Sequence, residues 1–194
     1  MSKTFTFGFL GEDVAQKNFL VHYLESQYKG VFSEVTEFGW RVKANTKDEV
    51  DANLQAALLF KIRFGLDVLF IGRDTDSSEK KSVESCREKI ANPFKGQSGV
   101  IFMIPIQCIE HWLWYLKWKR DNSGSTKNEP LESFKRTQAK NVVYGEKAKA
   151  ETRMHLANSL LADLDVTWLE SRSESFRHFH RQVTDFLTQY AKGQ

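Results

Sequence analysis

The 194-residue sequence has only two cysteines and three prolines, and its net charge of +3 is small. Cys86 and Cys108 lack the spacing of a metal site, so we expect reduced thiols in a cytoplasmic protein. No apolar run approaches the roughly 18 residues of a membrane span, and residues 1–3 lead into an expected strand with no signal peptide. A charge this mild does not indicate nucleic-acid binding by itself. The phosphate-loop pattern GxxxxGK followed by Ser or Thr is missing, so we expect no ATP use of that kind.

What is present is a globular composition, with 41% hydrophobic and 13% aromatic residues. Expected strands cover residues 4–10, 31–44 (bent at Gly39), 66–72 and 99–105. Expected helices cover residues 14–27, 46–62, 77–91, 108–119, 146–163 and 175–191. This alternation of strands and helices predicts an α/β fold with a mainly parallel sheet and right-handed crossovers.

The domain organisation follows from where the strands stop. We expect one domain over residues 1–194, with a sheet core in residues 1–120 and a helical C-terminal portion in residues 131–194. The polar segment 121–130 between them contains Gly, Ser, Asn and Pro and is expected to be a loop.

The most informative motif is Asp74-Thr75-Asp76, which follows the apolar segment 66–72. The carboxyl ends of parallel strands line the crevice where open α/β sheets bind ligands. Asp is disfavoured in strands and costly to bury, so paired carboxylates there need water or a cation. Mg²⁺, or Mn²⁺ in its place, takes oxygen ligands of this kind. A solvated turn is the alternative to a metal site formed by Asp74 and Asp76.

Glu12 stands at the equivalent place after the first expected strand. If the two strands are neighbours, Glu12, Asp74 and Asp76 converge, with carboxylates within about 4–8 Å of one another. These three are our candidate catalytic and metal-binding residues, with Glu12 either binding metal or acting as general base. Capping of the next helix explains Asp13, and a favourable position at the helix start is the alternative for Glu12.

This pattern of acids resembles the Toprim fold of topoisomerases, primases and overcoming-lysogenization-defect nucleases. Residues 12–19 (EDVAQKNF) resemble its first motif, although Asp13 replaces the usual Gly and Gln16 stands where an acid is common. Residues 104–113 (IPIQCIEHWL) and 175–179 (SFRHF) resemble Toprim-like proteins encoded beside ATPases in bacterial phage-defence loci. Among the residues that carry this resemblance, only the acidic ones indicate a particular chemistry.

The resemblance implies a Toprim-like, mainly parallel sheet flanked by helices and a Mg- or Mn-dependent nuclease that hydrolyses phosphodiester bonds of DNA or RNA. It further implies that the protein is the effector of an anti-phage defence system controlled by a partner ATPase supplied in trans. A Toprim-like accessory subunit that binds a partner without catalysis remains open. A receiver-like phosphoacceptor is a third class, but the Asp74-x-Asp76 pair fits its single acceptor Asp less well.

Glu110 follows the last expected strand and begins an aromatic helix. It is either a solvated residue at the helix start or a carboxylate facing the metal crevice, and the resemblance makes it a candidate metal ligand. We expect its neighbour His111 to be structural. For the accessory-subunit alternative, we expect Trp112, Leu113 and Leu116 to be buried and Trp114 or Trp118 to be left for a partner surface. 

Basic residues concentrate late in the chain, with ten Lys or Arg against five acids between residues 117 and 153. Cations beside a metal centre would hold a phosphate backbone, although a solvated helix face is the alternative. Lys147 and Lys149 are the best candidates for phosphate contact, and Lys147 also for stabilising the transition state. Lys140 and Arg177 complete the expected nucleic-acid-binding set, with Ser175 as the expected N-cap that places Arg177 near a helix start.

Overall fold

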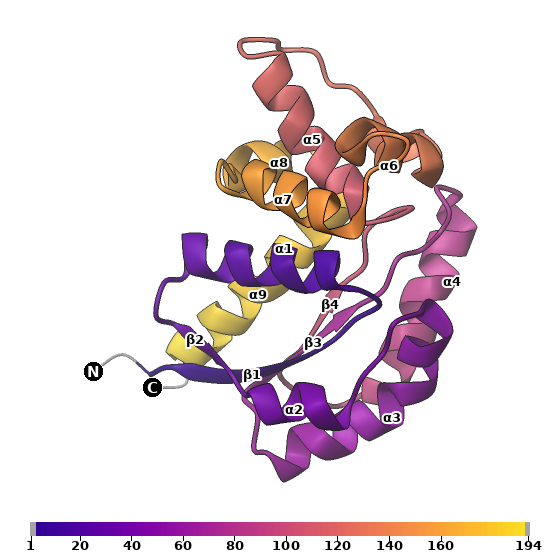
Figure 1. Ribbon diagram of the computed structural model, residues 1–194. Coiled ribbons are helices and arrows are strands. Elements are labelled where there is room, and N and C mark those ends of the chain that lie inside the picture. The colour runs from indigo at the N-terminus through magenta and orange to yellow at the C-terminus, as the bar shows by residue number, and fades with distance from the viewer. Residues whose placement is uncertain (1–2, 193–194) are drawn as a thin grey trace.

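The computed structural model describes residues 3–192, which form a parallel sheet flanked by helices (Figure 1). The strands are β1 (Phe5–Leu10), β2 (Phe32–Glu34), β3 (Val68–Gly72) and β4 (Val100–Met103), in the order β2-β1-β3-β4. Every pairing in this sheet is parallel. The α/β prediction with a parallel sheet and a helical C-terminal portion is confirmed.

Helices separate the strands and then continue to the end of the described chain. They are α1 (Val14–Gln27), α2 (Thr36–Arg41), α3 (Lys47–Arg63), α4 (Lys80–Ala91), α5 (Glu110–Asp121), α6 (Arg136–Tyr144), α7 (Ala150–Leu161), α8 (Val166–Arg172) and α9 (Glu174–Lys192). Short 3₁₀ turns lie at η1 (Asn92–Phe94) and η2 (Leu131–Ser133). Within residues 3–192, we find no helix with the length and apolar character needed to cross a membrane.

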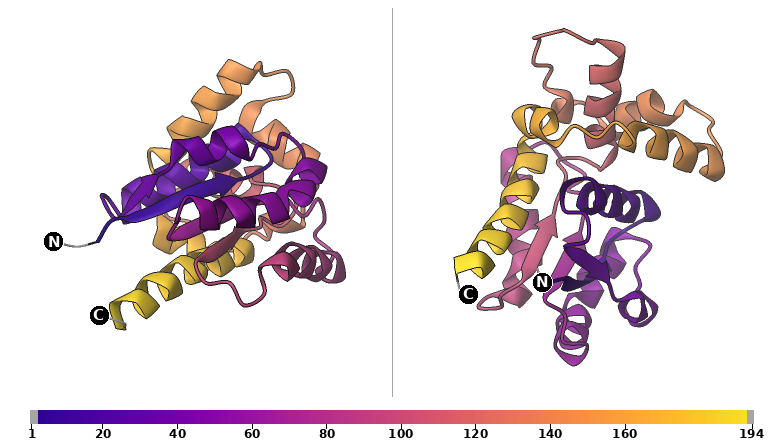
Figure 2. Two further views of the ribbon diagram at one scale, coloured as in Figure 1. Left: turned by 90° about the horizontal axis from the view of Figure 1, so that it is seen from below. Right: turned by 90° about the vertical axis from the view of Figure 1, so that its left-hand side faces the viewer.

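Each face of the sheet is covered by its own set of helices because side chains alternate along the strands. Phe5 and Phe7 of β1 pack with residues of α1, α5 and α9 on one face, whereas Leu69 and Ile71 of β3 pack with α2 and α3 on the other. Helix α9 runs back along the sheet to the start of β1, where the rings of Tyr190 and Phe5 are 4.7 Å apart (Figure 1 and Figure 2). The C-terminal portion therefore shares one hydrophobic core with the sheet.

The predicted strand over residues 31–44 is wrong beyond its first part. β2 ends at Glu34, and the chain turns at once into α2. Phe38 and Val42 are buried at helical spacing, while Trp40 between them is 69% exposed. Phe38 packs so closely on the sheet that a Cβ added to Gly8 would lie 2.7 Å from its ring. The apolar pattern that resembled alternation is one face of a helix.

The C-terminal helices also differ from the prediction. The expected helix over residues 146–163 begins only at Ala150, and α6 and α8 were not predicted. The expected N-cap at Ser175 is wrong as well. The hydroxyl of Ser173 accepts the hydrogen bond from the backbone N–H of Phe176, so Ser173 caps α9. Ser175 is buried and accepts a hydrogen bond from the Trp112 indole instead.

The aromatic helix α5 is covered from within the chain. Trp112, Leu113 and Leu116 are buried, as predicted. Trp114 is buried too and packs on Phe134, while the half-buried Trp118 stacks on Trp168 with ring centroids 6.2 Å apart. The prediction of a free tryptophan on α5 is wrong for Trp114, and most of the expected docking surface is used by the fold itself.

A side chain of α9 covers the free edge of the outer strand β4. The backbone N–H of Phe102 donates to Oε1 of Gln182 (2.9 Å), and Nε2 of Gln182 donates back to the Phe102 carbonyl (3.0 Å). One amide side chain therefore makes the pair of bonds that a neighbouring strand would make. This contact protects an edge that could otherwise pair with another chain.

We expect Gln182→Ala to lower the free energy of unfolding by about 1–2 kcal/mol, because two backbone groups of Phe102 lose their partners. Amide hydrogen exchange at Phe102 should accelerate. Gln189→Ala, at an exposed position of the same helix, is the matched control and should change neither quantity. Equal exchange rates at Phe102 in both variants would show that Gln182 does not protect the edge.

Candidate metal centre

The carboxyl ends of β1 and β3 meet at one edge of the sheet. Leu10 lies opposite Ile71 in the register of these strands, so the segments that follow them are neighbours. Glu12 reaches across this gap, and its Oε1 accepts a hydrogen bond of 2.6 Å from the backbone N–H of Asp74. The same oxygen lies 3.6 Å from Nη1 of Arg73. The structure thus brings Glu12 and Asp74 together at the predicted place.

Asp74 is deeply buried at this edge, with 3% of its surface exposed. Its Oδ1 accepts hydrogen bonds from Nε2 of Gln16 (2.8 Å) and from the backbone N–H of Ile109 (3.2 Å). Burial, followed by the nearby charges of Glu12 and Glu110, raises the pKa of Asp74 well above its ordinary value. A carboxylate in this environment needs either a proton or a cation.

Glu110 enters the same space from the first turn of α5. Only 3% of its surface is exposed. Its Oε1 lies 3.6 Å from Nζ of Lys140, and its Oε2 has no hydrogen-bond partner among residues 3–192. A buried carboxylate oxygen without a partner is costly, and such exceptions need an explanation. A bound cation would supply the missing partner.

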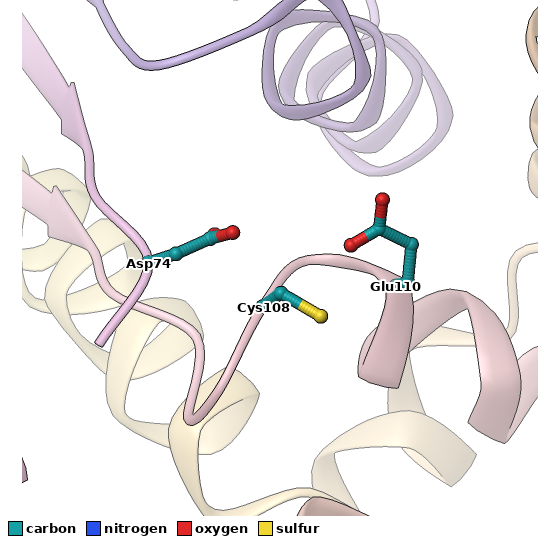
Figure 3. A group of neighbouring side chains, drawn as sticks. All are labelled: Asp74, Cys108 and Glu110. Carbon is teal, nitrogen blue, oxygen red and sulfur yellow. The ribbon is translucent and has the colours of Figure 1, made fainter. Parts of the chain in front are cut away.

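Cys108 completes a cluster with the two acids. One ligand atom each from Asp74, Cys108 and Glu110 can be chosen so that all three lie within 4.8 Å of one another. Figure 3 shows the Asp74 and Glu110 side chains directed toward each other, with the Cys108 sulfur beside them. Burial raises the pKa of the Cys108 thiol far above its ordinary value, as it also raises that of Asp74. The oxygen donors of the cluster are the carboxylates of Asp74 and Glu110.

Gln16 joins the two loops that form the site. Its Oε1 accepts from the backbone N–H of Glu12 (2.9 Å) while its Nε2 holds Asp74. Asp13 caps α1 by accepting from the backbone N–H of Gln16 (2.9 Å), as expected. A Cβ added to Gly72 would lie 2.6 Å from Oε1 of Gln16, so glycine permits this close approach. The Gln16 amide therefore orients Asp74 by donating a hydrogen bond to it. An ionised acid at this position would have no donor for this bond.

Asp76 is committed to ion pairs. Its carboxylate pairs with Nζ of Lys47 (2.9 Å) and with the guanidinium of Arg136. Its backbone has a φ of +54°, a left-handed conformation that Asp tolerates better than most residues. The Asp76 carboxylate therefore pairs with these two basic side chains. It is not part of the cluster that Asp74, Cys108 and Glu110 form.

The predicted basic residues lie in different surroundings. Lys140 of α6 faces Glu110, as described above. Lys147 and Lys149 are exposed in the segment that leads into α7. Arg177 donates to the carbonyls of Glu170 and Ser171 at the end of α8, so it serves the packing of α8 on α9. Of this set, the structure brings Lys140 to the carboxylates.

Burial also raises the pKa of Glu12, whose side chain is partly buried; the hydrogen bond from the backbone N–H of Asp74 and the charge of Arg73 oppose this shift. A raised pKa makes the Glu12 carboxylate a better proton acceptor, which is what a general base requires.

Several residues of the site were not predicted from the sequence. Gln16 was noted only as a departure from an acidic pattern, and Cys108 only as a packed thiol. Lys47 and Arg136 come from α3 and α6, and no local signal connects them to Asp76. The Cys108-x-Glu110 spacing just past a buried strand was the only signal that could have indicated Cys108. His111 is structural as expected, with Nε2 2.9 Å from the Phe134 carbonyl.

The chain was compared with protein-family models, with curated proteins and with solved structures, and none of them matches it.

Proposed function

We propose that the protein is a Mg²⁺- or Mn²⁺-dependent nuclease that hydrolyses phosphodiester bonds of DNA or RNA. The observation that carries the proposal is the buried pair Asp74 and Glu110 at the carboxyl edge of a parallel sheet, with Oε2 of Glu110 lacking a hydrogen-bond partner in the described part of the chain. Ligands of open α/β sheets bind at this edge. The Toprim resemblance of the acidic positions supports the same reaction class.

The residues present fit a hard divalent cation. Oδ1 of Asp74 is used by two hydrogen bonds, whereas Oε2 of Glu110 has no partner among residues 3–192, so the pair can still offer oxygen atoms to a cation. Glu12 stands beside the pair as a further ligand or as the general base, and carboxylate oxygens of this kind suit a hard cation. When bound, such a cation supplies an activated water and stabilises the developing charge on the phosphate.

The remaining side chains have separate tasks in this proposal. Glu12, with its raised pKa, accepts the proton of the attacking water. Lys140 lies beside Glu110 and holds the scissile phosphate, and Lys147 and Lys149 on the exposed segment before α7 contact the phosphate backbone. Asp76 acts as a positioning residue that ties Lys47 and Arg136 to the edge of the site.

In this proposal the nuclease is the cytoplasmic effector of an anti-phage defence system and is controlled by a partner ATPase. The resemblance of residues 104–113 and 175–179 supports that role. The alternative is an accessory subunit without catalysis that binds a partner protein. The burial of Trp114 and the stacking of Trp118 on Trp168 remove most of the surface on which that alternative depended.

Metal-dependent cleavage tests the proposal directly. Purified protein, with and without a candidate partner ATPase, is incubated with single- and double-stranded DNA and RNA in Mg²⁺, Mn²⁺ or chelator. We expect cleavage only with a divalent cation, and Glu110→Gln should reduce both the rate and the affinity for Mn²⁺ by about a hundredfold or more, since a charged ligand is lost.

Glu84→Gln on α4 is the matched control, because Glu84 is exposed and forms a surface ion pair with Lys80. It should cleave and bind Mn²⁺ like the unchanged protein. Binding of Mn²⁺ is followed by calorimetry, independently of cleavage. Cleavage that persists in chelator would refute the metal-dependent mechanism, and normal Mn²⁺ affinity in Glu110→Gln would remove Glu110 from the site.

A further inference from the structure

A cleft of about 490 Å³ opens beside the carboxylate cluster, between α1, α6 and α7. Glu110 belongs both to the wall of this cleft and to the cluster with Asp74. Asp13, at the start of α1, lines the same wall. Whatever occupies the cleft therefore lies next to the candidate metal centre. In Figure 1 α7 lies directly above α1, and α6 lies to the upper right of both.

Small side chains leave the cleft open. Ala148, Ala150 and Ala157 line it where larger residues would fill it. Its volume falls in the range of roughly 300–1,000 Å³ that is usual for small-molecule sites, and a single nucleotide fits in such a space. A base pair within a stacked duplex does not, because its two bases remain held between their neighbours.

The remaining wall offers surfaces for a flat base. Tyr144 lines the cleft but is buried, with 8% of its surface exposed, and the guanidinium of Arg153 lies over its ring, 6.0 Å from the ring centre. The guanidinium plane of Arg153 is therefore the surface on which a base would stack. Met154 adds a polarisable thioether. Bases stack on tyrosine rings and guanidinium planes whatever their sequence, with about 1–3 kcal/mol per stacked base. Arg153 is exposed and so remains accessible to a ligand.

Polar groups of both signs complete the cleft. Lys140 and Arg153 are cations suited to the phosphate of a nucleotide, while the Asp13 carboxylate is suited to the edge of a base. The amide of Asn18 donates to Sδ of Met154 (2.6 Å) and to Oδ1 of Asn158 (3.4 Å), which holds α1 against α7 at the cleft wall. A purely apolar ligand or a simple anion would leave one of these sets unused.

We propose that this cleft binds one unpaired nucleotide of single-stranded DNA or RNA next to the scissile phosphate. The inference rests on the proposed nuclease function and specifies its substrate class. A nucleotide in a duplex would first have to leave its stack, which costs a few kcal/mol, so single strands and loops are preferred over duplexes. Lys140, which faces both the cleft and Glu110, links the bound nucleotide to the metal centre.

The test measures binding separately from cleavage. Fluorescent 2-aminopurine is placed in single-stranded DNA, in single-stranded RNA of the same sequence and in the matching DNA duplex, with Ca²⁺ replacing Mg²⁺ to prevent hydrolysis. Ala150→Trp fills the cleft from an exposed position at the start of α7. We expect it to weaken single-strand binding at least tenfold and to abolish the change in 2-aminopurine fluorescence.

Thr152→Trp is the matched control. Thr152 is exposed on the same helix but points about 200° away from Ala150, because an α-helix has 3.6 residues per turn. It should bind like the unchanged protein, and melting curves should show that both variants are folded. Comparison of the two single strands tells whether DNA or RNA is the ligand. If Ala150→Trp does not fold, Arg153→Glu should show the same loss of single-strand binding.

The outcomes separate the cleft from the nuclease. Cleavage by the unchanged protein, with single-strand binding that Ala150→Trp and Arg153→Glu both leave intact, would overturn the cleft proposal and keep the nuclease. Equal binding of duplex and single strand would also overturn it. Cleft-dependent binding without any metal-dependent cleavage would keep the cleft and refute the nuclease.

Discussion

Asp74→Asn is expected to reduce metal-dependent cleavage by about a hundredfold or more, because it removes a charge from the carboxylate pair that holds the cation. The fold should be kept, since Asn still offers Oδ1 to the N–H donors of Gln16 and Ile109. Without metal, the melting temperature should stay the same or rise. Burial and the charges of Glu12 and Glu110 raise the pKa of Asp74, and the amide does not carry that cost.

The control is the same substitution at the other end of β3. Asp67 precedes the strand and accepts hydrogen bonds from the backbone N–H of Thr6 (2.9 Å) and from Nζ of Lys3 (2.7 Å). Asp67→Asn should leave cleavage unchanged and lower the melting temperature, the reverse of Asp74→Asn. Cleavage rates and melting curves in chelator are measured for both. If Asp74→Asn cleaves normally, the carboxylate pair is not catalytic, and if it unfolds, Asp74 is structural.

Glu132→Ala is expected to lower the free energy of unfolding by about 3 kcal/mol, because it leaves buried donors unpaired. In a chain of this length that corresponds to a loss of roughly 6–12 °C in melting temperature. Glu132 is buried in η2 and accepts from the hydroxyls of Ser173 (2.8 Å) and Ser175 and from the backbone N–H of Glu174 (3.1 Å). Since Ser175 also accepts from Trp112, the network joins η2, α5 and α9.

Burial raises the pKa of Glu132, although its hydrogen bonds with Ser175 and Ser173 oppose the shift. Glu132→Gln keeps an acceptor oxygen and should therefore cost less than Glu132→Ala. Glu146→Ala, at an exposed position before α7, is the control and should change stability by no more than about 0.5 kcal/mol. Thermal melting of the three variants measures the effect. Equal melting of Glu132→Ala and the control would show that the network adds nothing to stability.

Local signals were sufficient wherever an element is defined by its own residues. The run 66–72 predicted a strand, and β3 is buried at every position. The helix expected over residues 46–62 is α3, and the hydroxyl of Thr46 caps it by accepting from the backbone N–H of Glu49 at 3.3 Å. The Glu49 carboxylate in turn accepts from the backbone N–H of Asn45. Hydrophobic periodicity and capping act within a few residues, so they can be predicted from sequence.

Residues 31–44 show where local signals fail. Both a strand and a helix fit their apolar pattern, and packing of Phe38 against Gly8 favours the helix α2. The short helices α6 and α8 have weak periodicity and are stabilised by contacts with other helices, which a single segment does not reveal.

The sequence alone determined that acids follow β1 and β3, and parallel pairing of these strands was enough to bring Glu12 to Asp74. Only the tertiary structure decided which further groups meet there. Glu110 joins Asp74 because the segment after β4 lies beside the segment after β3, where the backbone N–H of Asp76 donates to the Gln107 carbonyl at 3.0 Å. Asp76 turns instead to Lys47 and Arg136, which come from distant helices. The physical reason is that the direction of a side chain at a strand end depends on long-range contacts of the following turn, and sequence spacing does not encode those contacts.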